Sequence, residues 1–347
     1  MAQSRIAIIG TGLIGTSIGL CLMSQKDRKF EIVGTDRDRG NARAAKKLGA
    51  LDREVGSLEE AVSDAGLVII AVPVGGVRQI FESIAPLLVT GAIVTDVCST
   101  KAEILKWAAE LLPPTVHFIG GHPMAGREKS GPGAAAADLF KGATWAVTPS
   151  PHAEEQAVNV VLGMIETAGA NPVYIDAAEH DQYAAAVSHV PILLSVALFR
   201  MVRDSVGWED AALLAGPGFR DLTRLASGDP AMSAGIVETN REAIAHWLKR
   251  YRETLDVVEK ALNAGEDVTA ALFTTTAMDR DAFLLNPPFR RQPDTTDPGS
   301  SADSIGRMLM GSGYDKMKDI INRPAKVGTD DAKLRRQLGS PGSRDDR

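Results

Sequence analysis

The hydrophobic pattern begins with a short apolar run, which is followed by closely spaced glycines and then by a second apolar stretch. Ile6-Ala7-Ile8-Ile9 predicts a buried strand, and the apolar residues after Gly15 predict a helix, with a tight turn between the two elements. A second strand is predicted at 31–35, and Asp36 ends it about 20 residues after the glycines. The chain therefore opens with a predicted strand–helix–strand unit.

The alternation of strands and helices continues to about residue 175. Continuous apolar runs predict further strands at 67–73, 92–96, 116–121, 144–148 and 172–175. The segments between them predict helices at 41–47, 57–65, 77–88, 101–112 and 153–168. Strands without polar alternation are typical of a parallel sheet that is covered on both faces. Residues 1–175 are therefore predicted to form a doubly wound α/β domain with a parallel sheet.

From residue 176 the pattern predicts helices only. Segment 181–204 is apolar on nearly every side, which is typical of a helix buried in a bundle or between subunits. Apolar residues from Ile244 to Leu262 recur at alternating three-four spacing, which indicates helix-on-helix packing. We expect an all-α domain at 176–264. The pattern fades after Gly265, and residues 265–347 are predicted to be an extension with a linker at 286–301, a short helix at 304–321 and a mobile charged end.

Composition narrows the class of protein. A chain of 347 residues that is 44% hydrophobic and 24% charged is typical of a soluble globular protein with two domains. The net charge of −6 opposes nucleic-acid binding, which usually needs a basic face. Cys21 and Cys98 lie in apolar or small-residue runs, so a reduced, cytoplasmic protein is expected. No leader, membrane span or metal-ligand spacing is recognised.

The opening glycines fit G-x-G-x-x-G, the pattern in which missing side chains let a backbone approach a pyrophosphate at a helix N-terminus. Asp36 lies where a Rossmann-type unit places the carboxylate that binds a ribose hydroxyl. The alternative is a plain strand–helix–strand unit whose glycines serve packing only. The predicted cofactor site consists of Gly10, Thr11, Gly12, Leu13, Ile14, Gly15, Asp36, Arg37 and Val72.

Two candidate catalytic residues follow predicted strands, where an open α/β sheet places its ligands. Ser99 lies just before a predicted capping box of Thr100 and Glu103, so its hydroxyl is left to face the crevice. His122 lies in Gly-His-Pro-Met-Ala-Gly, and a histidine can accept a proton near neutral pH. Helix capping and a histidine that merely hydrogen-bonds a turn are the structural alternatives.

The helical half supplies candidate substrate ligands. Ser188 and His189 precede Pro191, which interrupts the hydrogen bonding of the apolar helix, although a satisfied core histidine is a competing interpretation. Arg220 and Arg224 lie one turn apart after a glycine turn and suit bidentate recognition of carboxylates, unless Asp221 pairs with one of them.

Together these motifs resemble the prephenate/arogenate dehydrogenases of tyrosine biosynthesis over roughly residues 5–262. In chain order they are G-x-G-x-x-G at 10–15 with Asp36, Asp-Val-x-Ser-x-Lys at 96–101, Gly-His-Pro-Met-Ala-Gly at 121–126, Glu179-His180-Asp181, Ser188-His189-x-Pro191 and Gly218-Phe219-Arg220-Asp221-x-Thr223-Arg224.

The resemblance implies a function and roles for the candidate residues. Prephenate would be oxidised and decarboxylated to 4-hydroxyphenylpyruvate, with NAD taking the hydride. His122 would take the proton of the C4 hydroxyl, Ser99 would orient that hydroxyl or His122, and Arg224 would hold a substrate carboxylate. His189 would line the pocket from a helical domain that also forms a homodimer. Asp36 favours NAD over NADP, because the 2′-phosphate of NADP would meet its carboxylate. Arg37 weakens this preference, since it could neutralise that phosphate.

Three alternatives remain open at this stage. Arogenate dehydrogenase differs in an amino group on the substrate, for which Asp221 is a candidate partner. Another NAD(P)-linked dehydrogenase with a helical dimer domain typically needs a catalytic lysine on the first long helix after the sheet, where this chain has Ser188 and His189. A cofactor-binding regulator without catalysis would not need the crevice histidine or the arginine pair.

Overall fold

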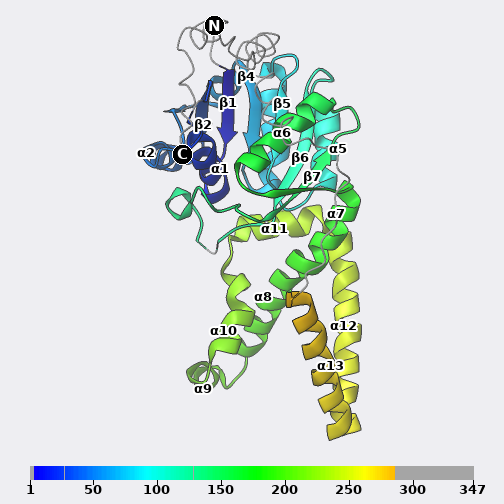
Figure 1. Cartoon of the computed structure of the whole chain (residues 1–347). Coiled ribbons are helices and arrows are strands. Elements are labelled where there is room, and N and C mark those ends of the chain that lie inside the picture. The colour runs from blue at the N-terminus through cyan, green and yellow to red at the C-terminus, as the bar shows by residue number, and fades with distance from the viewer. Residues whose placement is uncertain (1–3, 27, 128, 286–347) are drawn as a thin grey trace, which may run out of the picture.

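The structure is a computed structural model that describes residues 4–26, 28–127 and 129–285, and Figure 1 shows a sheet domain above a group of long helices. The linker, short helix and charged end predicted beyond residue 285 lie outside the described residues.

One eight-stranded sheet organises the first domain, in the order β3-β2-β1-β4-β5-β6-β7-β8. The strands are β1 (Ser4–Ile9), β2 (Phe30–Thr35), β3 (Arg53–Glu54), β4 (Ala65–Ile70), β5 (Ile93–Asp96), β6 (His117–Pro123), β7 (Thr144–Pro149) and β8 (Asn171–Tyr174). The helices between them are α1 (Leu13–Met23), α2 (Arg39–Lys47), α3 (Leu58–Val62), α4 (Val77–Ile84), α5 (Ala102–Leu111) and α6 (Glu155–Thr167).

The sheet is mostly parallel, but the prediction of a wholly parallel sheet is wrong at one position. β7 runs antiparallel to β6, with Trp145 paired with Pro123, whereas β7 and β8 are parallel. Between β6 and β7 the chain makes only a short 3-10 turn among its described residues, and no crossover helix carries it back to the other end of the sheet.

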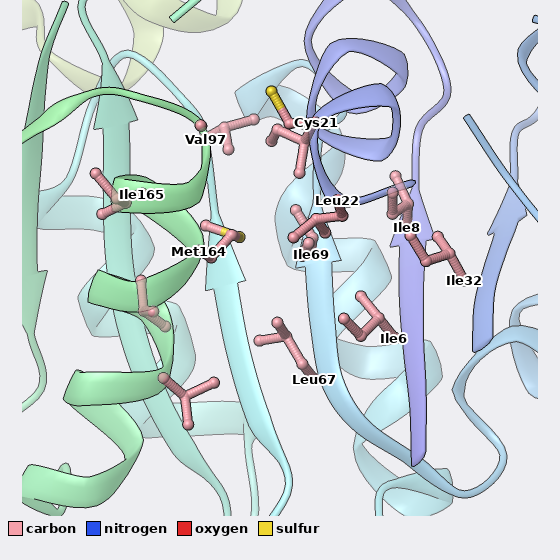
Figure 2. Packing of buried hydrophobic residues seen from close by; sticks show 14 of the residues in the cluster. Ile6, Ile8, Cys21, Leu22, Ile32, Leu67, Ile69, Val97, Met164 and Ile165 are labelled. Atoms are coloured by element: carbon pink, nitrogen blue, oxygen red, sulfur yellow. The ribbon is translucent and has the colours of Figure 1, made fainter. Parts of the chain in front are cut away.

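Both faces of the sheet are buried, as the continuous apolar strands predict. Figure 2 shows one face, on which Ile6 and Ile8 of β1 pack with Leu22 of α1 and Met164 of α6. The alternate residues of the same strands form a second cluster with α4 and α5, which includes Phe81. Helix α1 is thus packed on this face of the sheet, and its N-terminus follows the carboxyl end of β1.

The second domain is helical. Its elements are α7 (Ala177–Ala184), a π-helical turn (Ala185–His189), α8 (Val190–Arg203), α9 (Trp208–Leu213), α10 (Pro217–Thr223), a 3-10 turn (Arg224–Ser227), α11 (Pro230–Thr239), α12 (Arg241–Ala264) and α13 (Glu266–Leu285). Ala185, Val190, Ile236, Ala243 and Ile244 form its small buried core.

Residues Ala177–Arg203 form one continuous helical stretch of 27 residues, which is long and apolar enough to cross a membrane by length and composition alone. The π-helical turn in this stretch comes immediately before Pro191, which lacks the N–H needed for a regular helical bond. The first turns of the stretch hold buried His180 and Asp181, and the stretch packs on α9, α10 and α12, so it is the central helix of this domain. Met201 and Val196 on its outer side are exposed in the single chain.

Helix α13 occupies the first part of the predicted extension, where the sequence pattern predicted no particular element. Gly265 has φ of 112°, a left-handed conformation that suits glycine, and α13 then folds back along α12 (Figure 1). None of its residues is buried, and Phe273, Met278 and Phe283 are exposed. Because α13 has no buried face within one chain, its sequence lacks the periodicity by which amphipathic helices are recognised.

Candidate active site

The three glycines of the opening turn differ in the space around them, and only Gly12 faces open space at the start of α1. A side chain at Gly10, whose φ is 94°, would place its Cβ 2.4 Å from the carbonyl oxygen of Ala71. A Cβ at Gly15 would lie 2.0 Å from the carbonyl oxygen of Gly10, so this glycine allows the helix to approach the turn. By contrast, nothing lies within 4 Å of a Cβ built at Gly12, the N-cap residue of α1, which has no side-chain cap. This arrangement fits a dinucleotide, which the glycine turn and the N-terminus of α1 would hold by its pyrophosphate.

Asp36 lies beside this turn. Its Oδ2 accepts a hydrogen bond from the backbone N–H of Thr11 at 2.8 Å, and its Oδ1 accepts one from the N–H of Asp38 at 2.9 Å. Val72, half-buried after β4, has its Cγ1 2.9 Å from the Cβ position of Gly10. Arg37 is exposed at the rim. The structure therefore brings the predicted cofactor residues together at the carboxyl edge of the sheet.

His122 lies at the carboxyl end of β6 and is 6% exposed. A buried ion pair holds the neighbouring backbone, because Lys101 pairs with Asp96 and donates from Nζ to the carbonyl oxygen of Gly121 at 2.7 Å. Ser99 is half-buried in the segment between β5 and α5. Both candidate catalytic residues thus lie at the end of adjacent strands, as predicted.

The helical domain contributes two residues to which the sequence assigned no role. His180 of α7 places Nε2 2.9 Å from Nδ1 of His122, and its own Nδ1 lies 2.8 Å from Oδ1 of Asp181. All three side chains are buried. The base candidate of the sheet domain is therefore connected to a carboxylate of the helical domain.

Asp181 also caps α5, which corrects the predicted capping box. Its carboxylate oxygens accept hydrogen bonds from the backbone N–H of Lys101 at 2.8 Å and of Ala102 at 2.9 Å. The hydroxyl of Thr100 lies instead 2.9 Å from that of Thr239 in α11. A buried carboxylate that accepts from two backbone amides satisfies this helix end better than a local hydroxyl would.

His189 is held in a second branch of the same network. Nδ2 of Asn240 donates to the carbonyl oxygen of Asp181 at 2.7 Å and lies 3.1 Å from Nδ1 of His189. Because an amide nitrogen only donates, Nδ1 of His189 accepts, and the ring carries its hydrogen on Nε2. His189 is 1% exposed, its Nε2 makes no hydrogen bond of normal geometry within the described part of the chain, and the backbone of Ser99 lies close enough to raise the pKa of this ring.

Burial keeps His122 and His189 neutral. It lowers the pKa of His122 well below its usual range, and the neighbouring His180, Lys101 and His189 lower it further because they disfavour another positive charge beside them. Burial also lowers the pKa of His189 to about 4, against the opposing charge of Asp181. At neutral pH His122 is thus unprotonated at one ring nitrogen and able to accept a proton.

The two arginines predicted to bind substrate lie in the helical domain. Arg220 is exposed on α10, and exposed Arg224 begins the following turn. Helix α10 packs on α8, and Figure 1 shows it apart from the sheet domain. Ser188 is half-buried in the π-helical turn beside His189. Convergence of Arg220 and Arg224 with His122 on one substrate stays a prediction.

Comparisons with known proteins agree with this architecture. Residues 20–174 match the nucleotide-binding domain of prephenate dehydrogenase, and residues 176–274 match its dimerisation domain. Prephenate dehydrogenase of Bacillus subtilis is 35% identical over 260 residues, which are 74% of this chain and 69% of that protein.

Two solved structures extend the comparison. Prephenate dehydrogenase of A. aeolicus, in complex with hydroxyphenyl propionate and NAD+, has a TM-score of 0.74 and 26% identity and covers 81% of this chain and 99% of its own. Synechocystis arogenate dehydrogenase has a TM-score of 0.67 and 28% identity and covers 80% of this chain and 99% of its own. The nucleotide-binding sheet domain, the helical domain and the relatives agree: the chain belongs to the prephenate dehydrogenase family of oxidoreductases.

Proposed function

We propose that this protein catalyses the oxidative decarboxylation of prephenate to 4-hydroxyphenylpyruvate with NAD as hydride acceptor, in tyrosine biosynthesis. The observation that carries the proposal is the meeting, at one edge of the sheet, of an open dinucleotide turn and a neutral buried histidine. The identity to prephenate dehydrogenases supports the substrate, and the A. aeolicus complex supports NAD.

The reaction explains why a histidine is needed. The C4 hydrogen of prephenate leaves as hydride, the ring carboxylate leaves as carbon dioxide, and the ring becomes aromatic. NAD, when bound over the glycine turn, supplies the hydride acceptor. The substrate begins with a hydroxyl at C4 and the product ends with a phenol, so no proton is released overall. His122 therefore takes the hydroxyl proton as the C4 carbonyl forms and returns it to the phenolate oxygen.

The remaining residues would bind and orient the substrate. Ser99 orients the C4 hydroxyl or His122, and His189 donates its Nε2 hydrogen to a substrate oxygen, with Ser188 beside it. Arg224, with Arg220, binds the substrate carboxylates through bidentate hydrogen bonds.

We also infer a cytoplasmic homodimer. The match to a dimerisation domain supports it, as do the exposed apolar side chains of α9, α10 and α13, such as Leu213, Leu222 and Phe273. The two buried free cysteines are consistent with a reducing compartment. Light scattering of the purified protein at micromolar concentration is expected to give twice the chain mass.

The direct test is NADH production with prephenate and with arogenate, each combined with NAD and with NADP. Turnover is expected with prephenate and NAD. Turnover with arogenate alone would replace the proposed substrate, an outcome that the likeness to the Synechocystis arogenate dehydrogenase makes worth measuring. No turnover with either substrate would contradict the proposed function.

A further inference from the structure

The hydrogen bonds from Asp181 to His122 can each be given a direction. An ionised carboxylate only accepts, so Nδ1 of His180 donates to Asp181. When the His180 ring carries only this hydrogen, its Nε2 accepts, and Nδ1 of His122 donates across the 2.9 Å contact. The remaining ring nitrogen of His122, Nε2, consequently carries the lone pair.

Asp181 is fixed firmly enough to impose this direction. Its side chain accepts from the backbone N–H groups of Lys101 and Ala102 at the start of α5, and its backbone carbonyl accepts from Asn240. Rotation of the carboxylate would break both of these side-chain hydrogen bonds and leave two backbone N–H groups at the start of α5 unsatisfied.

The surroundings of His122 explain why it needs such support. Lys101, from the segment before α5, disfavours a positive charge on His122, and the buried neutral ring of His189 in the π-helical turn supplies no negative charge to offset it. Asp96, at the end of β5, is already paired with Lys101. Asp181 is the carboxylate that the network connects to His122, and it acts through His180. A proton taken up at Nε2 of His122 is therefore stabilised by a shift of the Nδ1 hydrogen toward His180 and Asp181.

We propose that His180, oriented by Asp181, is a positioning residue for His122: it fixes the tautomer protonated on Nδ1 and shares the positive charge that His122 acquires from the substrate hydroxyl. This inference rests on the proposed function for the identity of the proton donor, whereas the tautomer is a property of the protein alone. The proton is held only until the phenolate takes it back.

Two substitutions separate orientation from charge sharing. His180→Gln keeps an acceptor for the Nδ1 hydrogen of His122 but cannot take up a proton, and His180→Phe removes both properties. Gln182→Ala, an exposed position on the same helix, is the matched control. We expect kcat to fall about 10²-fold or more in His180→Phe and about 10-fold in His180→Gln, with KM for both substrates within about threefold of the control.

Nitrogen chemical shifts of protein labelled with 15N-histidine provide a readout that does not depend on turnover. We expect His122 to be protonated on Nδ1 in the wild type and in His180→Gln, and to lose this preference in His180→Phe. The proposal is overturned if wild-type His122 is protonated on Nε2, if both variants keep the kcat of the control, or if they raise KM alone. Should the wild type show this tautomer yet fail to oxidise prephenate, the proposed function fails and the assignment of the hydrogen bonds stands.

Discussion

His122 and His180 belong to different domains, and a single contact of 2.9 Å between their ring nitrogens joins the sheet domain to the helical domain at the candidate base. The base is therefore assembled from two parts of the fold, and neither domain alone holds it in place. Substitutions on both sides of this contact give separate expectations.

Replacement of the base itself is the first prediction. His122→Asn leaves a polar side chain at the end of β6 but removes the group that accepts a proton. We expect kcat with prephenate and NAD to fall about 10²–10⁴-fold, the range that general-base catalysis contributes, with an unchanged Kd for NAD. Full turnover in steady-state assays would rule out the assigned proton acceptor.

Gly12 and Gly15 of the opening turn are expected to respond differently to alanine. A methyl group at Gly12 enters open space on a backbone with φ of −72°, so Gly12→Ala should keep its Tm and raise the Kd for NAD. At Gly15 the added carbon would lie 2.0 Å from a carbonyl oxygen, so Gly15→Ala should lower the Tm by several degrees. Calorimetry and NAD titration test both, and equal NAD affinity of Gly12→Ala and wild type would contradict the assignment of the pyrophosphate site.

Asp181 should be sensitive to loss of its charge. In Asp181→Asn an amide group replaces one oxygen that accepts from a backbone N–H of α5, which should cost about 1–3 kcal/mol in the free energy of unfolding. Asp176→Asn is the matched control, since Asp176 accepts from Ala178 and Glu179 at the exposed start of α7, where asparagine caps equally well. Equal destabilisation by the two substitutions in urea denaturation would argue against a special role for the cap on α5.

Acid should destabilise the protein partly through His189. Its pKa is lowered to about 4 from 6.5, so between these values the unfolded state binds more protons than the folded state. This contribution to stability is complete above pH 6.5 and falls as the pH is lowered through the window, by about 3 kcal/mol in total. Urea denaturation of the wild type between pH 7 and pH 4 should show a steeper loss than His189→Gln, and parallel curves would contradict the buried neutral state.

Arg224 is expected to act on binding. If it holds a substrate carboxylate, Arg224→Ala should raise KM for prephenate about 10–100-fold, because charged hydrogen bonds contribute about 1.5–3 kcal/mol. Arg200→Ala, which removes a surface ion pair with Asp204 on the same domain, should leave KM unchanged. An unchanged KM in Arg224→Ala would show that the carboxylate is bound by another group.

Local patterns could predict the sheet, the glycine turn and His122, because each depends on neighbours within a few residues. The direction of β7 was missed because the alternation of strands and helices elsewhere favours a parallel sheet, although no helix was predicted between the strands that became β6 and β7. The cap on α5 escaped prediction because its partner, Asp181, is 80 residues away, and a long-range carboxylate replaced the local hydroxyl of Thr100. Helix α13 has no buried face in one chain and so gives no periodic pattern.

The cap that Asp181 places on α5 has a consequence for how the enzyme comes into being. Contact between the two domains caps helix α5 of the sheet domain and, through His180, also positions the candidate base His122. If the two domains packed incorrectly, the glycine turn could still bind a dinucleotide, but His122 would lack the support of His180. Such a molecule would be inactive. Enzyme activity therefore depends on correct packing of the helical domain against the sheet domain.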